Sequence, residues 1–292
     1  MAYQHGERAA RMPAWMRRPL AREGSYTAVK GVLVQHGLST VCQSAKCPNQ
    51  GECFSAGTAT FLVAGPVCTR ACRFCAVEPG RPAPLDPTEP DRVAAAAAEL
   101  ALDHIVVTMV TRDDLEDGAA GHVAKVIHAV RGARPGTAVE VLTSDFAGSW
   151  AALDTVLEAA PDVFNHNVET VPRLYASVRP QADYERSLRV LARAAERGTL
   201  PVKSGLMVGL GESYEEVVSV LRDLRDAGCS IVTIGQYLRP SPAHLPVAEF
   251  VRPEVFEELA AQAHGLGFAA VASGPFVRSS YRAAEAATAA RA

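Results

Sequence analysis

Apolar runs rich in β-branched residues alternate with amphipathic stretches of helical length from residue 61 onward. Strands that alternate with helices pair in parallel through right-handed crossovers, so the chain is restricted to an α/β barrel or an open α/β sheet. The pattern predicts six strands, at residues 61–65, 104–110, 139–143, 163–170, 201–209 and 231–238. It predicts six helices, at residues 91–102, 118–131, 149–160, 183–197, 213–227 and 253–265. Six such units are fewer than the eight of a complete (β/α)8 barrel.

The predicted helix at 213–227 has the clearest ends. Ser213 and Glu216 stand in capping-box spacing at its start, and Gly228 follows its last residue. Apolar residues at helical spacing predict one buried face, made of Val217, Val220, Leu221 and Leu224.

The two ends of the chain do not follow the alternation. Residues 1–60 hold short apolar patches and three cysteines, and we expect them to form an extension packed against the α/β region. Residues 271–292 run into an alanine-rich end that we expect to be frayed. The sequence thus predicts an N-terminal extension (1–60), an α/β domain (61–270) and a C-terminal segment (271–292).

The charge balance argues against a nucleic-acid partner. Lys and Arg number 29 and Asp and Glu number 32, a formal net charge of −3, so no overall positive field would hold a phosphate backbone. No stretch is long and apolar enough to span a bilayer, so we expect no membrane partner either. The N-terminal arginines would suit an organellar transit peptide, but Glu7, Glu23 and the lack of an amphipathic repeat favour a cytoplasmic protein.

Six of the seven cysteines crowd between Cys42 and Cys75, and Cys229 stands alone far downstream. In a large intracellular protein, clustered cysteines are more often metal ligands than disulfides, because the cytosol keeps thiols reduced. Cys229 precedes a predicted strand, and we interpret it as a small buried apolar residue.

The tightest group is Cys68, Cys72 and Cys75, spaced C-x3-C-x2-C directly after the first predicted strand. The carboxyl ends of parallel strands are where α/β proteins place their active sites. Three thiolates on so short a loop can surround one iron–sulfur cube and leave one iron open, whereas ferredoxin clusters take four cysteines. Structural zinc is the alternative, but it favours separated C-x2-C pairs and a closed tetrahedral shell.

This motif, with Phe74 before its last cysteine, resembles the radical SAM superfamily, whose members use S-adenosylmethionine (SAM). The resemblance implies a partial (β/α)6 TIM-like barrel with N- and C-terminal extensions. It also implies a 4Fe-4S cluster on Cys68, Cys72 and Cys75 whose open iron chelates SAM. An electron from that cluster would cleave SAM to a 5′-deoxyadenosyl radical, while the protein positions and shields the cofactor.

A second triad, Cys42, Cys47 and Cys53, is spaced C-x4-C-x5-C. Together the two triads resemble the lipoyl synthase family, and the resemblance extends over nearly the whole chain. The segments that carry it are 103–106, 112–115, 139–143, 164–170, 203–207, 233–237, 244–246 and 273–275. The resemblance implies a second, auxiliary 4Fe-4S cluster on this triad, which would donate sulfur.

The same resemblance implies further site residues. In the family a serine of a C-terminal Arg-Ser-Ser-Tyr signature is the fourth ligand of the auxiliary cluster, a role that falls on Ser279, next to Arg278. A serine oxygen is a weaker partner for cluster iron than a thiolate, so a serine-held iron could detach while sulfide is given up. Candidate SAM contacts are Phe74, Asn165, Glu169, Lys203, Gly205, Gly209 and Gln236. The polar ones among them could equally be ordinary buried hydrogen-bonded groups.

The reaction implied by the resemblance is the insertion of two sulfur atoms, at C6 and C8 of a protein-bound octanoyl-lysine. Unactivated C–H bonds require a radical, and each insertion would use one SAM. The substrates would be octanoylated lipoyl carrier domains, namely the E2 subunits of 2-oxoacid dehydrogenases and the glycine cleavage H protein. Ferredoxin or flavodoxin would supply electrons, and an iron–sulfur cluster carrier would rebuild the auxiliary cluster.

Two other functions remain open at this point. Another radical SAM sulfur-inserting enzyme would share the triad at 68–75, but not the combination of the triad at 42–53 with residues 278–281. A non-enzymatic iron–sulfur carrier would bind clusters without cleaving SAM, and it would not need six βα units.

Overall fold

The computed structural model describes residues 12–16, 25–198 and 200–291. Its centre is an eight-stranded sheet in the order β1-β2-β5-β6-β7-β8-β9-β10. Every neighbouring pair from β2 to β10 is parallel, and β1 joins β2 antiparallel. The strands are β1 (Ser39–Thr40), β2 (Thr60–Val63), β5 (His104–Met109), β6 (Ala138–Leu142), β7 (Val163–Asn165), β8 (Val202–Val208), β9 (Ile231–Gln236) and β10 (Ala270–Gly274). All six predicted strands are confirmed, in chain order, as in a partial TIM-like barrel.

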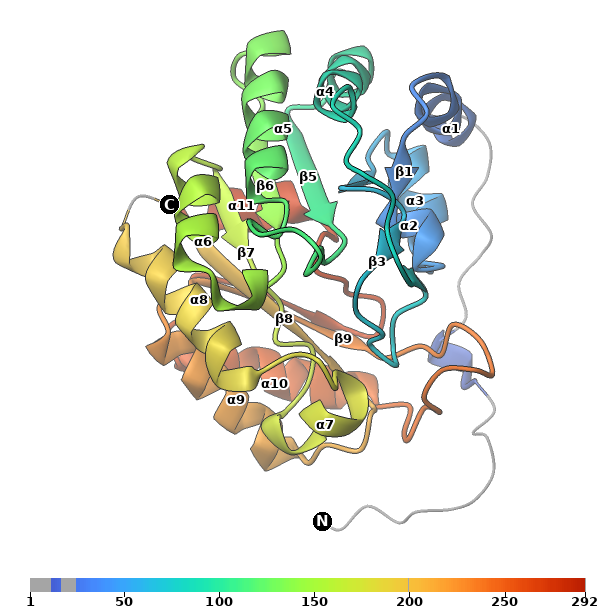
Figure 1. Cartoon of the computed structure of the whole chain (residues 1–292). Coiled ribbons are helices and arrows are strands. Elements are labelled where there is room, and N and C mark those ends of the chain that lie inside the picture. The colour runs from blue at the N-terminus through green and yellow to red at the C-terminus, as the bar shows by residue number, and fades with distance from the viewer. Residues whose placement is uncertain (1–11, 17–24, 199, 292) are drawn as a thin grey trace.

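Six long helices follow the parallel strands, as predicted, and lie around the outside of the sheet (Figure 1). They are α4 (Glu89–Glu99), α5 (Ala120–Ala133), α6 (Trp150–Glu158), α8 (Tyr184–Glu196), α9 (Tyr214–Asp226) and α10 (Pro253–Gly265). Helix α9 has the expected capping box, because Ser213 Oγ accepts the Glu216 amide hydrogen and the Glu216 carboxylate accepts that of Ser213. Among the described residues, no helix has the length and apolar character needed to cross a membrane.

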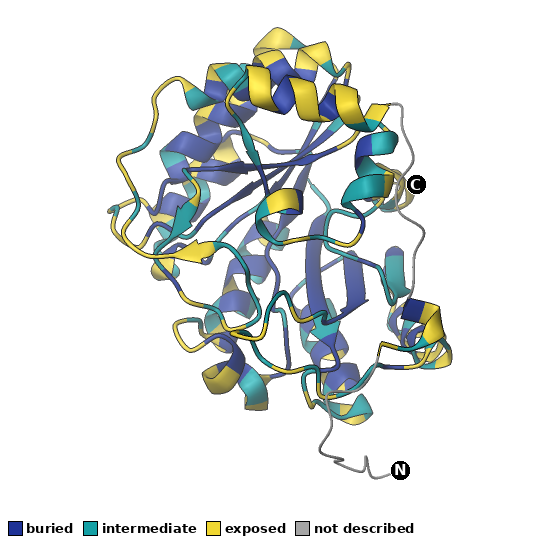
Figure 2. Cartoon of the chain, turned by 90° about the vertical axis from the view of Figure 1, so that its right-hand side faces the viewer, coloured by how far each residue is buried: buried dark blue, intermediate teal, exposed yellow. Residues whose placement is uncertain are grey.

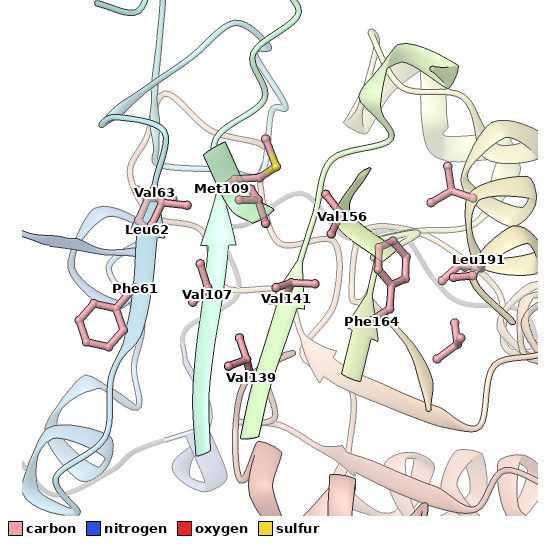
Figure 3. Packing of buried hydrophobic residues seen from close by; sticks show 14 of the residues in the cluster. Phe61, Leu62, Val63, Val107, Met109, Val139, Val141, Val156, Phe164 and Leu191 are labelled. Atoms are coloured by element: carbon pink, nitrogen blue, oxygen red, sulfur yellow. The ribbon is translucent and has the colours of Figure 1, made fainter. Parts of the chain in front are cut away.

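The main hydrophobic core fills the space between strands and helices. Figure 3 shows Val141 and Phe164 of the sheet beside Val156 of α6 and Leu191 of α8, and all four residues are fully buried. Because successive side chains of a strand point to opposite faces of the sheet, Glu140, which precedes Val141 on β6, points to the face away from the helices. Figure 2 shows that the strands of the central sheet are buried, while exposed residues lie on the outer faces of the helices, on loops and on the short strand Glu78–Pro79.

Strand β7 is shorter than predicted, since it ends at Asn165 rather than at residue 170. Glu169 adopts a left-handed backbone conformation with φ of 65°, which L-residues other than glycine rarely adopt and which interrupts a strand. A single bridge from Glu169 to Leu206 of β8 is all that continues the pairing.

Several short elements have no counterpart in the predicted pattern. The N-terminal region contributes α1 (Ser25–Gln35), α2 (Val41–Ser44) and α3 (Gln50–Ser55), as well as β1 at the sheet edge. A separate parallel pair, β3 (Val67–Cys68) and β4 (Glu78–Pro79), holds the cysteine loop. The remaining elements are α7 (Tyr175–Val178), α11 (Ala283–Ala289) and three 3-10 turns at Ala14–Met16, Phe146–Gly148 and Pro172–Leu174.

The expectation of a frayed C-terminal end is wrong for the described residues. Helix α11 packs Ala287 against Val163, Ile231 and Ala270, which lie at the amino ends of β7, β9 and β10. Beyond the helix, Arg291 Nη2 donates to the backbone oxygen of Asp162 at 3.0 Å. Alanine has a high helix propensity and a small side chain, so an alanine-rich helix can approach the strand ends closely and cover the base of the barrel.

This packing predicts that the end of the chain contributes to stability. Ala287 is 4% exposed, so Ala287→Glu would bury an unpaired carboxylate and lower the free energy of unfolding by about 2 kcal/mol. Thermal melting measures the change. Ala284→Glu, on the exposed side of the same helix, is the matched control and should melt like the unmodified chain. Equal melting of the two variants would show that α11 does not pack at the base.

Candidate active site

A cavity of about 520 Å³ opens at the carboxyl ends of the parallel strands. The cysteine loop forms one side, with Cys68, Cys72 and Cys75 on the lining. The strand ends supply the floor, through residues such as Thr108, Leu142 and Gly205. Other lining residues come from segments distant in sequence, among them Cys47, Arg179 and residues 277–280.

Backbone hydrogen bonds fix the shape of the cysteine loop. The Gly80 amide donates to the Cys68 carbonyl at 2.8 Å, and the Cys75 amide donates to the Cys72 carbonyl at 3.0 Å. The Arg70 amide points at Cys68 Sγ, at 3.4 Å. The three thiols therefore face one cavity on a loop whose ends are tied together by β3 and β4.

Arg70, between the first two cysteines, anchors this loop to the barrel. Its guanidinium makes two bonds to Asp113, at 2.7 and 2.9 Å, and one to Asp145, at 2.6 Å. Burial would raise the pKa of Asp145, but the hydrogen bond and charge of Arg70 outweigh it and lower the pKa to about 2. Both aspartates follow strand ends, so the loop is clamped to β5 and β6 by charge-assisted bonds.

The three thiols suit an iron–sulfur cluster by their chemistry. Burial raises the pKa of Cys75 to about 12 and also raises that of Cys72, against the nearby positive charge of Arg179. Iron binds thiolates, so cluster binding displaces these protons. Within the described part of the chain, no three Cys, His, Asp or Glu side chains converge on a single metal ion. A cube whose irons each take a separate thiolate instead needs sulfurs spread around a larger volume.

The second triad lies on the N-terminal extension beside this cavity. Cys42 lies on α2 and is buried, Cys53 lies on α3, and Cys47 between them lines the cavity. Burial raises the pKa of Cys42, and hydrogen bonds with Thr60 oppose that shift. A negative charge on Cys47 would raise the pKa of Cys42 further.

The C-terminal serines reach the same region from the other end of the chain. Ser279 Oγ accepts a hydrogen bond from Asn165 Nδ2 at 2.8 Å and donates one to Asn167 Oδ1 at 2.9 Å. Ser280 Oγ accepts from Thr60 Oγ1 at 2.8 Å, and Thr60 also contacts Cys42. Both serines line the cavity, as does Arg278.

This segment crosses the barrel at a glycine. A Cβ on Gly235 of β9 would lie 2.1 Å from the Val277 carbonyl oxygen, closer than any real contact. Arg278 Nη1 donates to that same carbonyl oxygen at 2.6 Å. Only glycine at position 235 therefore lets the chain bring Ser279 over the strand ends.

The sequence-based SAM contacts divide into two groups. Phe74, Glu169 and Gly205 line the cavity, whereas Asn165, Lys203, Gly209 and Gln236 do not. A Cβ on Gly205 would lie 2.4 Å from Thr233 Oγ1, so the bare backbone is needed there. Burial raises the pKa of Glu169, against the charge of Arg179 and a hydrogen bond from Asn167.

The residues outside the lining support the site from behind. Lys203 is fully buried and pairs with Glu140 at 2.8 Å. Gln236 Nε2 donates to the carbonyl oxygens of Val208, Tyr237 and Glu249, and its Oε1 accepts from the Val251 amide. Gly209, with φ of 95°, packs against Gln236 and donates its amide hydrogen to Glu212.

Arg179 lines the cavity and was missed by the sequence analysis, whereas His166, also on the lining, lies within the segment 164–170 that carries the family resemblance. Arg179 is 9% exposed, donates to the carbonyls of Asn167 and Val168, and has an Nε with no hydrogen-bond partner among the described residues. His166 donates from Nδ1 to the Thr143 carbonyl, and burial lowers its pKa to about 4, so the ring is neutral near pH 7. Arg179 follows a short helix and belongs to no motif, so only the fold reveals it.

Comparison with known proteins supports the resemblance drawn from the cysteine spacing. Residues 62–235 match the family model of the radical SAM superfamily. The lipoyl synthase of Caldanaerobacter subterraneus subsp. tengcongensis is 56% identical over 274 residues, which cover 94% of this chain and 96% of that protein. The lipoyl synthase of Nitratidesulfovibrio vulgaris strain Hildenborough is also 56% identical, over 94% of this chain and 91% of that protein.

Solved structures share the fold at much lower identity. Methylornithine synthase (PylB) superposes with a TM-score of 0.54 and 13% identity, covering 85% of this chain and 81% of that one. SuiB of Streptococcus suis bound to S-adenosylmethionine gives a TM-score of 0.56 and 9% identity, covering 74% of this chain and 51% of that one. With identity above one half over nearly its full length, the chain belongs to the lipoyl synthase family of the radical SAM superfamily.

Proposed function

We infer that this chain is a sulfurtransferase that inserts two sulfur atoms, at C6 and C8, into an octanoyl group carried on a lysine of a lipoyl carrier domain. The observation that carries the inference is the meeting of three chain segments at one cavity, in a member of the lipoyl synthase family. The segments are the cysteine loop at 68–75, the N-terminal segment that lines the cavity with Cys47, and the serines at 279–280.

The enzyme uses SAM and two 4Fe-4S clusters. When bound, one cluster supplies the electron that cleaves SAM and the other supplies sulfur. We propose that Cys68, Cys72 and Cys75 hold the first, and that Cys42, Cys47, Cys53 and Ser279 hold the second. Arg278, which lines the cavity beside Ser279, would hold that segment close to the reacting groups.

The lining between the two cysteine groups suits an alkyl chain. It includes apolar side chains from several elements: Val41, Leu62, Met109, Leu142, Leu206, Tyr237 and Leu238. Each buried methylene is worth about 0.8 kcal/mol, so such a wall binds an octanoyl chain without polar contacts. It also excludes water from the site, which protects a reactive radical from side reactions.

The lining also offers polar groups to SAM. We propose Phe74, Glu169 and Gly205 as direct contacts, because they line the cavity. Arg179 joins them, since it lines the cavity and its positive charge suits a carboxylate. Asn165, Lys203, Gly209 and Gln236 lie behind the lining, and we propose that they support the contacts rather than make them.

The proposed reaction also implies partner proteins. The substrates are lipoyl carrier domains, and we propose those of 2-oxoacid dehydrogenase E2 subunits and the glycine cleavage H protein. A ferredoxin or flavodoxin would supply electrons, and an iron–sulfur carrier would restore the auxiliary cluster. We propose the cytoplasm as the compartment, because a reducing compartment keeps the cysteines of both triads available to bind clusters. We also keep the division into segments 1–60, 61–270 and 271–292 as a proposal.

Substitution of one cysteine from each triad separates the two proposed clusters. Cys72→Ala should abolish 5′-deoxyadenosine formation from SAM, because it removes a ligand of the cluster that cleaves SAM. Cys47→Ala should keep that activity but abolish the two-sulfur mass gain of an octanoyl-lysine peptide. The assay is anaerobic, with SAM and dithionite, and is read by mass spectrometry.

The control is Cys229→Ala, since Cys229 is fully buried and remote from the lining. It should retain both activities. A chain that forms no 5′-deoxyadenosine with both clusters loaded would be a carrier rather than an enzyme. One that cleaves SAM but leaves the peptide unmodified would be a different radical SAM enzyme.

The serine ligand has its own test, with its neighbour as the matched comparison. Ser279→Ala should lower sulfur insertion by at least about tenfold, a loss that even an outer-shell partner of a metal site can cause. Ser280→Ala should have the smaller effect, although Ser280 bonds to Thr60 next to Cys42. Iron content per chain and the yield of thiolated peptide measure the difference. A larger loss with Ser280→Ala than with Ser279→Ala would mean that Ser280, and not Ser279, is the ligand.

A further inference from the structure

Glu140 and Lys203 form a buried ion pair inside the barrel that the proposed chemistry does not use. Glu140 lies on β6 and Lys203 on β8, both side chains are fully buried, and Lys203 Nζ lies 2.8 Å from Glu140 Oε1. Neither residue lines the cavity. Replacing a buried ion pair by apolar residues often leaves a protein equally or more stable, so stability alone does not account for these charges.

Glu140 is a carboxylate in this setting. Burial opposes its ionisation, but the charge of Lys203 and the nearby His104 outweigh burial and hold the pKa of Glu140 below its ordinary value. An ionised carboxylate only accepts hydrogen bonds. Every group that faces Glu140 Oε1 must therefore present a hydrogen to it.

Asn165 is such a group. It lies on β7, between β6 and β8, and its Nδ2 is 3.3 Å from Glu140 Oε1 and 2.8 Å from Ser279 Oγ. Because Glu140 accepts only, it forces the NH2 side of the amide to face inward, which leaves the second N–H for Ser279. Among the described residues, Asn165 Oδ1 has no hydrogen-bond partner that could turn the amide the other way.

The consequence falls on the Ser279 hydroxyl. Its oxygen accepts from Asn165, so its own hydrogen goes to Asn167 Oδ1, at 2.9 Å. With both bonds made, Ser279 Oγ is held at one point on the cavity wall. Without Glu140, the orientation of the Asn165 amide would depend on Ser279 alone, whose hydrogen is directed to Asn167 Oδ1 because Asn167 Nδ2 donates to Glu169 at 3.1 Å.

We propose that Glu140 and Lys203 are positioning residues, which act through Asn165 to hold Ser279 Oγ in the place where it binds the auxiliary cluster. This inference rests on the proposed role of Ser279. It assigns a function to two buried charges that touch neither SAM nor the octanoyl chain.

The test is a double-mutant cycle on iron retention. The double replacement Glu140→Leu with Lys203→Met removes both charges at similar volume. It is made in the full chain with Ser279 present and, separately, with Ser279→Ala. After both clusters are loaded anaerobically, transfer of iron to a chelator is followed by absorbance. With Ser279 present, we expect iron loss to speed up by about two- to tenfold, the range that one hydrogen bond of ordinary net strength gives.

With Ser279→Ala, the same double replacement should add no further acceleration, because the group it positions is gone. Equal acceleration in both backgrounds would mean that the ion pair acts by general loosening, and would overturn the inference. If Ser279→Ala speeds iron loss but the double replacement does not, the positioning role alone is wrong. If Ser279→Ala itself has no effect, the proposed ligand is wrong, and with it the role of the pair.

Two further variants serve as a control and as a substitute for the double replacement. Tyr184→Phe removes a partly buried hydrogen bond, to Asp223 at 2.7 Å, on the outer helices α8 and α9, and it should leave iron loss unchanged. If the double replacement does not yield a folded chain, Glu140→Gln with Lys203→Met enters the same cycle. It keeps the shape of the Glu140 side chain, and without the Lys203 ammonium either side of the new amide can face Asn165, so the orientation of Asn165 is no longer dictated. It should also accelerate iron loss only when Ser279 is present.

Discussion

The site depends first on hydrogen bonds that join the two ends of the chain. Asn49 Nδ2 donates to the Phe276 carbonyl at 2.6 Å, across 227 residues of sequence, and Tyr281 Oη donates to Glu52 at 2.8 Å. Closing so long a loop costs little more entropy than closing a shorter one, and the barrel already brings β2 and β10 to the two sides of the same opening. These bonds bring Cys47 from the N-terminal region and Ser279 and Ser280 from the C-terminal region to one cavity.

Charge inside the barrel is organised in pairs that hold positions. Arg70 joins the cysteine loop to Asp113 and Asp145, and Lys203 joins β8 to Glu140 of β6. In a medium of low dielectric, such pairs are strong and directional. A site that must keep several groups in register around a reactive species benefits from such rigidity more than from the net stability of the pairs.

The sequence predicts the regular part of the fold well, because strands buried on both faces and helices with one apolar face leave clear periodic patterns. The predicted strand at 163–170 is longer than β7, because no sequence pattern indicates the left-handed backbone of Glu169. Alanine-rich α11 has no apolar stripe of large residues, so its packing was invisible before the strand ends were placed. At the site, motif spacing found the cysteines and serines. Periodicity could not predict that Lys203 lies behind the cavity and Arg179 on its lining. That difference depends on whether each side chain points toward the cavity or away from it in the folded barrel.

The position of α11 has a consequence for biosynthesis. Ser279 and the helix that closes the base of the barrel both follow the last strand, β10, in chain order. Domains begin to fold from the N-terminus while synthesis continues, but these elements leave the ribosome after every strand of the sheet. The nascent barrel is therefore open at its base and lacks Ser279 while its strands emerge, so a complete auxiliary site can form only after the whole sheet has been synthesised.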